Sequence, residues 1–127
     1  MADSVADGRL LFMLGELTEY RRRLGLSKAA VADILGVSIT TLYRWESYGM
    51  LSKLNDRNAE MVTLFCNAAR AALDEYPDFT DRFITHAVAS QRLGVTHEWL
   101  LRLYREGRTN GEDFGILGIF YPKEGHE

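Results

Sequence analysis

The stretch of sequence that decides the fold is Lys28-Ala-Ala-Val-Ala-Asp-Ile-Leu-Gly-Val-Ser-Ile-Thr-Thr-Leu-Tyr-Arg-Trp-Glu46. Its pattern predicts two short helices joined by a tight turn. Ala32 is small enough for the helices to cross closely, and Gly36 can adopt the positive φ that a sharp corner requires. Ser38 is a suitable N-cap for the second helix, because its hydroxyl can accept a hydrogen bond from a free backbone N–H.

Apolar and polar residues divide this stretch into an inner and an outer side. The residues expected to close the angle between the helices are Val31, Leu35, Val37, Leu42 and Trp45. The residues expected to point outward are Ile39, Thr40, Tyr43 and Arg44. This is the layout of a DNA-reading helix-turn-helix, and an ordinary helical hairpin in an all-α core is the alternative.

The second helix, from Ile39 to Ser47, is therefore the expected recognition helix. Arg44 can pair with guanine through two hydrogen bonds, and Ile39 can contact a thymine methyl group. Tyr43 can stack on a sugar or donate to a phosphate. The base-reading candidates of this helix are Ser38, Ile39, Thr40, Tyr43 and Arg44, with Thr41 as a phosphate candidate.

Basic residues precede the motif. A helix is expected from Arg9 to Leu24, with Arg21, Arg22 and Arg23 in its last turn. Cations are favourable at a helix C-terminus, so the triplet has either that role or phosphate contact. Ser27 caps the next helix, and Lys28 at its start is a phosphate candidate because the first helix of such motifs crosses the DNA backbone.

Three segments together resemble a known family: Gly25-Leu26-Ser27-Lys28, Val31-Ala32-Asp33-Ile34-Leu35-Gly36-Val37-Ser38 and Thr41-Leu42-Tyr43-Arg44-Trp45-Glu46. They resemble the lambda repressor/Cro superfamily of helix-turn-helix regulators over residues 16–65. One departure is Lys28, where family members often carry Gln. Residues 40–51 also resemble the mercury-resistance-regulator class, so the choice between the two classes stays open for this half.

A long helix follows, capped by Asn55 or Asp56 and running to about Glu75. Its apolar face comprises Met61, Leu64, Phe65, Ala68, Ala69, Ala72 and Leu73. This face can cover the core of the first motif, form a homodimer, or act as a rigid spacer. Tyr76-Pro77-Asp78 then ends the helix, which predicts two domains over residues 1–76 and 77–127.

A second copy of the motif is visible when residues 29–50 are laid over residues 87–108, where seven of 22 positions are identical. The matches include Gly36 with Gly94 and Arg44 with Arg102, and Ser38 meets Thr96, which keeps the capping chemistry. We therefore expect helices over His86–Leu93 and His97–Glu106, with Ser90 at the small-residue position that Ala32 holds in the first copy.

The second motif is followed by a predicted β-hairpin. Phe-Gly-Ile-Leu-Gly-Ile-Phe-Tyr at residues 114–121 favours short strands, with Leu117-Gly118 as the turn. Residues 83–124 thereby resemble the winged helix-turn-helix of excisionases and mercury-resistance-type regulators. In that family the wing commonly contacts phosphate or the minor groove, but here the acidic Glu112 and Asp113 stand just before it.

In the second copy the outward residues are expected to be Thr96, His97, Glu98, Leu101 and Arg102. Arg102 is the best base-reading candidate, and Thr96, His97 and Glu98 are further ones. Glu98 can alternatively stabilise the helix N-terminus. Arg105 and Arg108 are phosphate candidates, with a solvated helix end as the alternative role.

The charge distribution fits two DNA-contacting segments. The chain of 127 residues has a net charge of −3, which argues against indiscriminate nucleic-acid binding. Residues 16–53 carry six Lys/Arg against four Asp/Glu, and residues 82–111 carry five against two. Residues 54–81 and 112–127 are acidic. Two basic segments are thus separated and followed by acidic ones.

Other classes of function leave no pattern in the sequence. The three His residues and the single Cys66 show no metal-ligand spacing, and no glycine pattern matches a phosphate or dinucleotide loop. We expect no enzyme, no cofactor, no small-molecule ligand and no membrane-spanning segment. A lone cysteine, expected to pack as a small hydrophobe, and the absence of a secretion signal predict a cytoplasmic protein, in a bacterium or a phage-infected host.

The sequence therefore predicts a mainly α protein with two tandem helix-turn-helix units, the second winged. Its expected function is sequence-specific binding of double-stranded DNA by two recognition helices, as a transcriptional repressor of a phage or mobile element. One alternative is an excisionase-like recombination directionality factor. Another is a protein that binds DNA with one motif and a protein with the other.

Overall fold

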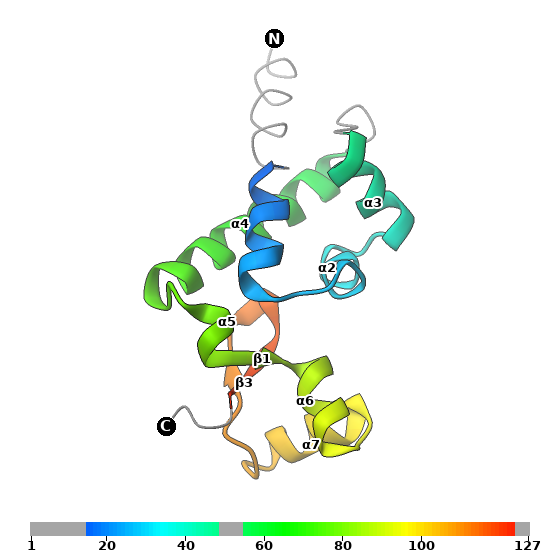
Figure 1. Ribbon diagram of the computed structural model, residues 1–127. Helices are drawn as coiled ribbons and strands as arrows, with labels where there is room; N and C mark the ends of the chain where they lie inside the picture. The colour runs from blue at the N-terminus through cyan, green and yellow to red at the C-terminus, as the bar shows by residue number, and fades with distance from the viewer. Residues whose placement is uncertain (1–14, 49–54, 124–127) are drawn as a thin grey trace.

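The computed structural model describes residues 15–48 and 55–123. An N-terminal helix is described over residues 15–24, and its expected start at Arg9 lies outside the described residues. Helix α2 spans Lys28–Leu35 and helix α3 spans Ile39–Tyr48. The N-terminal helix, α2 and α3 lie in the upper half of the molecule in Figure 1.

The turn between α2 and α3 has the predicted chemistry. Gly36 adopts a φ of 74° in the left-handed region, which costs a glycine little because it has no Cβ. The Ser38 hydroxyl accepts a hydrogen bond from the backbone N–H of Thr41 at 3.0 Å, as an N-cap should. Ala32 is buried where the two helices pack together. The helix-turn-helix predicted from residues 28–46 is present.

Helix α4, Asp56–Glu75, crosses behind the first motif. Asn55 is its N-cap, and its side chain accepts a hydrogen bond from the N–H of Asn58 at 2.8 Å. The helix ends just before Pro77, as predicted. Its inner side includes Val62 and Cys66, which the predicted apolar face left out. Leu64, which that face included, is instead 48% exposed.

The C-terminal half combines short helices with a small antiparallel sheet in the order β1-β3-β2. The register pairs Ile84 with Tyr121, and Asp113 with Ile119. The short elements α5 and β1 were not predicted from the sequence. The elements of this half are α5 (Phe79–Arg82), β1 (Phe83–Thr85), α6 (His86–Leu93), α7 (His97–Arg105), β2 (Glu112–Asp113), the 3-10 helix η2 (Gly115–Leu117) and β3 (Ile119–Pro122).

The predicted hairpin needs correction. Its turn is not Leu117-Gly118 alone, because residues 114–118 form a wider loop that contains η2. The Phe114 N–H donates to the Gly118 carbonyl at 2.9 Å and closes this loop. Glu112 and Asp113 lie within strand β2 rather than before the hairpin. The leucine of the predicted turn is instead an interior residue, since the Leu117 side chain is only 3% exposed.

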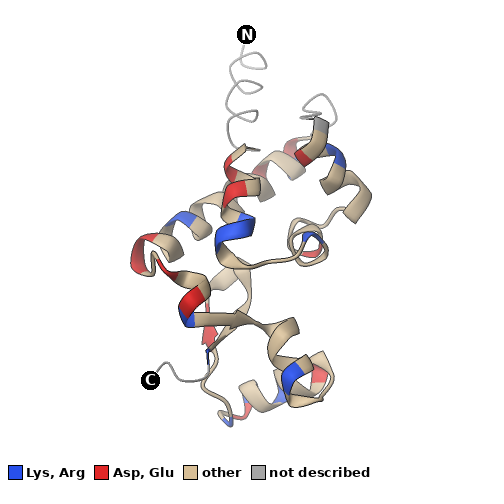
Figure 2. Cartoon of the chain, in the orientation of Figure 1, with Lys and Arg blue, Asp and Glu red and all other residues tan. Residues whose placement is uncertain are grey.

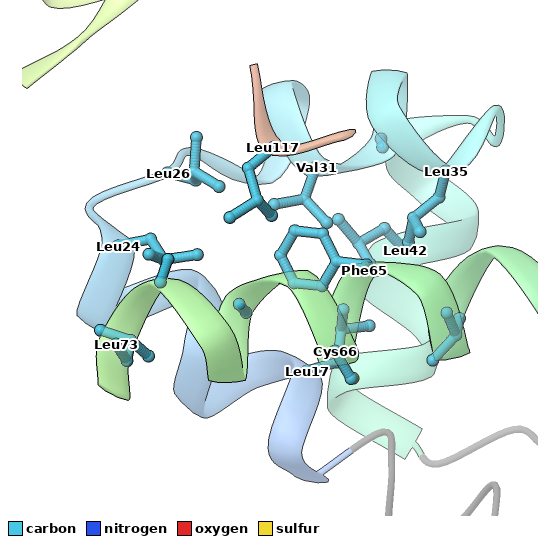
Figure 3. Close-up of a cluster of buried hydrophobic side chains, with 14 of the residues drawn as sticks. Leu17, Leu24, Leu26, Val31, Leu35, Leu42, Phe65, Cys66, Leu73 and Leu117 are labelled. Carbon is cyan, nitrogen blue, oxygen red and sulfur yellow. The ribbon is translucent and has the colours of Figure 1, made fainter. Parts of the chain in front are cut away.

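Leu117 joins the two halves of the chain. In Figure 3 it lies beside Val31 of α2 and Phe65 of α4, and η2 packs against α4. Removing a leucine side chain from water contributes about 2 kcal/mol. The tip of the predicted wing is therefore used to hold the halves together, and Leu117 is unavailable to DNA.

Aromatic rings extend this shared core across residues 76–77, where the sequence predicted a domain boundary. Phe79 packs against Phe120 edge-to-face, with ring centroids 4.9 Å apart. Tyr76 contacts Phe83 in the same manner at 5.0 Å. The main hydrophobic core contains residues from both predicted domains, including Leu24, Phe65, Phe79, Leu117 and Phe120. The core is thus not divided at the predicted boundary.

Candidate nucleic-acid interface

The outer face of α3 presents most of the side chains that the sequence assigned to base reading. Ile39 is 51% exposed and Tyr43 is 49% exposed, and Thr40 and Arg44 are also exposed. On the opposite side Leu42 and Trp45 are buried against the core. Exposing the apolar side chain of Ile39 to water is unfavourable, and a partner that covers this side chain removes that unfavourable free energy.

Ser38 and Thr41 are linked at the start of α3. Ser38 accepts from the Thr41 N–H and its hydroxyl donates to the Thr41 hydroxyl at 2.9 Å. The Ser38 hydroxyl hydrogen is thus engaged with Thr41, while the Ser38 oxygen caps the helix. The remaining lone pairs can still accept a hydrogen bond, so the role left to Ser38 at an interface is that of an acceptor.

A groove of about 550 Å³ runs between α3 and the start of α4. Arg44 lines it from α3, and Arg57 and Asn58 line it from the first turn of α4. The sequence analysis missed these two residues, because Arg57 follows Asp56 in a segment that is acidic as a whole. Two arginines and the N-terminus of α4 make this groove favourable for an anion. Its lining residues are Gly36, Val37, Ser38, Thr41, Arg44, Trp45, Asn55, Arg57 and Asn58.

The three consecutive arginines before the motif have different environments. Arg21 forms a two-pronged ion pair with Glu46, with N–O distances of 3.0 and 3.1 Å. The two side chains are 12% and 6% exposed, and Arg21 also donates to the Leu26 carbonyl. Arg21 therefore fastens the N-terminal helix to α3 and is not placed for phosphate contact. Arg22 and Arg23 are exposed.

Lys28, the other phosphate candidate of this half, is half-buried at the start of α2. Its ammonium group lies over the ring of Tyr43, 4.9 Å from the ring centre. This cation–π contact restrains both side chains on the same outer surface. The Lys28–Tyr43 pair can therefore present a positive charge and a phenol together beside α3.

Helices α6 and α7 repeat the local geometry of α2 and α3. Gly94 has a φ of 69°, against 74° for Gly36. Thr96 caps α7 by accepting from the Trp99 N–H at 3.0 Å. Ser90 is buried at the position that corresponds to Ala32. The two helices therefore begin and end within one residue of the predicted limits.

Histidine side chains fasten the starts of α6 and α7 to each other. His86 contacts the His97 carbonyl oxygen through Nε2 at 2.9 Å and the Tyr121 hydroxyl through Nδ1 at 3.0 Å. A carbonyl only accepts, so Nε2 carries a hydrogen, and burial raises the pKa of Tyr121 so that its phenol stays protonated. In neutral His86, Nδ1 then accepts from Tyr121. This network fixes α7 against β3.

The outer face of α7 agrees with the sequence analysis except at two positions. Thr96, His97, Glu98 and Arg102 are exposed, as expected. Leu101, expected outward, is half-buried, whereas Trp99 is 46% exposed. The phosphate candidates Arg105 and Arg108 are also exposed, and an Arg108 nitrogen lies 3.7 Å from a Glu106 oxygen.

Charge is unevenly placed on the molecule. Figure 2 shows acidic positions gathered at the C-terminal end of α4 and on α5, at the left of the view. The arginines of α7 lie in the lower part of the same view, away from that acidic end. A polyanion is therefore repelled by the left side and can approach the outer sides of α3 and α7.

The described residues offer little for other chemistry. Within residues 15–48 and 55–123, no three His, Cys, Asp or Glu side chains are grouped so that they could hold a metal ion. In the same ranges no helix is both long and apolar enough to cross a membrane. Burial raises the pKa of the Cys66 thiol from 9.0 to about 12, so Cys66 is a poor nucleophile at neutral pH.

Comparison with known proteins supports the first motif. Residues 17–55 match a family model described as helix-turn-helix, which covers the N-terminal helix from residue 17, α2 and α3. No curated protein and no solved structure shows a significant match to the chain. The match does not extend to α6 and α7. It supports a sequence-specific DNA-binding regulator whose first motif is of the lambda repressor/Cro type.

Proposed function

We propose that this protein is a transcriptional repressor, from a phage or other mobile element, that binds an asymmetric site on double-stranded DNA. The observation that carries the proposal is the exposed polar and aliphatic face of α3, in a segment that matches the helix-turn-helix family. The mobile-element origin rests on the resemblance of the chain to phage regulators. Repression requires only that the bound protein cover promoter DNA.

Helix α3 is the first recognition helix. Arg44 pairs with a guanine and Ile39 contacts a thymine methyl group, and Thr40 lies between them on the same exposed face. Tyr43 and Lys28 contact the sugar-phosphate backbone as a pair. Phosphates of the same strand approach the groove at the start of α4, where Arg57 supplies a further cation.

Helix α7 is the second recognition helix. Arg102 reads a base, and Arg105 and Arg108 contact phosphates. Strand β3 supports this role, because it links the two helix pairs: its Tyr121 packs with Ala89 of α6 and Leu100 of α7, and its Phe120 belongs to the main core. The two half-sites then have one fixed spacing, which we expect to be about one helical turn of DNA.

The proposed binding unit is a single chain. Phe65, Ala69, Ala72 and Leu73, the larger part of the face considered for a homodimer, pack inside the chain. Leu64 is the large exposed apolar residue that remains on the described length of α4. We further propose that the protein acts in the cytoplasm, without cofactor or catalytic activity.

One alternative has an observation of its own. Glu98 precedes the exposed Trp99 on α7 and Glu106 is the C-cap of the helix, and a mixed acidic and aromatic surface of this kind also suits a protein partner. In that case α3 alone binds DNA. An excisionase-like architectural protein would use the same surfaces as a repressor and differ in its output, which is bending of the DNA.

The proposal is tested by selecting bound sequences from random duplexes and measuring affinity for the enriched duplex. Arg44→Ala should weaken binding by about 10- to 100-fold, since a bidentate contact to guanine contributes about 1–3 kcal/mol. The matched control is Arg82→Ala. Arg82 is exposed on α5 and pairs with Asp78, away from α3. Absence of any enriched sequence would overturn sequence-specific binding.

A further inference from the structure

The exposed tryptophan of α7 is an unusual surface feature. The chain has two tryptophans; Trp45 is 2% exposed and Trp99 is 46% exposed. Tryptophan offers more apolar surface than any other side chain, and exposed tryptophans are enriched where a partner binds. Trp99 belongs to neither cluster of buried hydrophobic residues. Nearly half of its surface is therefore available to a partner.

Arg102 is held in place by two neighbours. Its guanidinium carbon lies 5.4 Å from the centre of the Trp99 ring system, and its Nε donates to Glu106 at 3.2 Å. Among the described residues, no protein partner engages its two terminal nitrogens. Those nitrogens are parallel donors on a side chain that is 67% exposed. The contacts thus orient the arginine without using the donors that a ligand would need.

An arginine held in this way is suited to a planar acceptor pair. Guanine presents O6 and N7 side by side in the major groove, and two parallel N–H groups match them. Part of the rotamer entropy that binding would cost has already been lost in the contacts with Trp99 and Glu106. Trp99 lies three residues before Arg102, so both side chains share one face of α7.

We propose that Trp99 and Arg102 read two neighbouring base pairs, a thymine and a guanine, in the second half-site. Arg102 donates to the guanine, and the indole ring packs against the 5-methyl group of the thymine, the apolar feature of the major groove. The inference rests on the proposed function, because it needs α7 to enter the major groove. It adds Trp99, which the sequence analysis did not select.

The surroundings of the pair favour DNA over a protein partner. Arg105 and Arg108 are exposed on and just beyond the same helix, while Glu106 is engaged with Arg102 and Arg108. Glu98 then remains as the acidic side chain of this face. Arg102 also occupies the position that Arg44 holds in the first motif, on a helix with the same turn and cap.

The test removes single groups from the DNA as well as from the protein. Uracil in place of the thymine removes one methyl group and should weaken wild-type binding about fourfold, the equivalent of one buried methyl. Replacing guanine by 7-deazaguanine removes N7. The Trp99→Ala variant should bind the uracil duplex as tightly as the thymine duplex. The Arg102→Ala variant should bind the 7-deazaguanine duplex as tightly as the guanine duplex. Both side chains are exposed, so the variants should fold; Trp99→Phe is the conservative comparison.

Each outcome either supports or overturns the proposal. The proposal is supported if Trp99→Ala removes only the effect of uracil on affinity and Arg102→Ala removes only the effect of 7-deazaguanine. If Trp99→Ala binds every duplex as the wild type does while Arg44→Ala does not, the proposal fails and binding through α3 stands. If Trp99→Ala loses a protein partner but keeps its DNA affinity, α7 is a protein-contacting helix and the proposal also fails. If no duplex is enriched at all, the proposed function itself fails.

Discussion

Replacing Leu117 by alanine should destabilise both halves of the chain together. Its side chain is 3% exposed and lies between α2 and α4, so the substitution leaves a cavity that neither helix can easily fill. Leucine-to-alanine changes in such positions cost about 2–5 kcal/mol. For a chain of this length that corresponds to a fall in Tm of about 8–20 °C, at about 4 °C for each kcal/mol.

The two tryptophans allow the halves to be followed separately. Trp45 reports on the first motif and Trp99 on the second, so Trp99→Phe and Trp45→Phe backgrounds leave one probe in each half. Thermal unfolding by fluorescence should show both probes shifting equally in Leu117→Ala. Leu93→Ala, at a leucine that is 61% exposed, is the control and should cost less than about 0.5 kcal/mol. A shift confined to the Trp99 probe would refute a shared core.

Three further predictions concern stability. Glu46→Ala should lower the free energy of unfolding, measured with denaturant, by about 3–5 kcal/mol, because it leaves the charge of the nearly buried Arg21 without its carboxylate. Recovery in a double variant with Arg21→Met would confirm the cause. Burial raises the pKa of the Cys66 thiol from 9.0 to about 12 in the folded state, so the contribution of this thiol to stability is complete below pH 9 and is lost as the pH rises toward about 12. Between these pH values the free energy of unfolding should therefore fall less in Cys66→Ala than in the wild type. Gly36→Ala and Gly94→Ala should each cost about 1–2 kcal/mol from positive φ alone, since a Cβ would meet no atom within 4 Å, and a neutral result would contradict the left-handed turn.

Local sequence signals predicted the helices well. Each helix is determined by signals that lie within a few residues of one another: the apolar spacing, a capping residue such as Ser38 or Thr96, and a turn glycine. A short stretch of sequence is therefore enough to predict it. The outward side of α3 follows from the same spacing, and the structure places Ile39 and Arg44 there.

The inward role of Arg21 had a signal that was missed. Arg21 lies four residues after Leu17 and three before Leu24, and both leucines are buried, so all three share one side of the helix. Trp99 had no comparable signal. It and Leu101 flank the buried Leu100 on opposite sides, and only the packing of neighbouring elements decides which flank is covered.

Long-range features could not be predicted from the sequence. Strand β1 has three residues, which are too few to show the alternation of apolar and polar residues that marks a strand. Its place in the sheet depends on pairing with β3, more than 30 residues away in the sequence. The same limit applies to Leu117. A short apolar turn after a second motif resembles a wing, and nothing local indicates that its leucine packs against α4.

Hydroxyl-radical footprinting of the wild-type protein on the enriched duplex tests the central claim most directly, because it shows where one chain lies along the DNA. We expect two protected tracts of different sequence on one side of the duplex, about one helical turn apart. In Arg102→Ala the second tract should lose protection while the first remains. A single tract that Arg102→Ala leaves unchanged would contradict recognition by two helices of one chain.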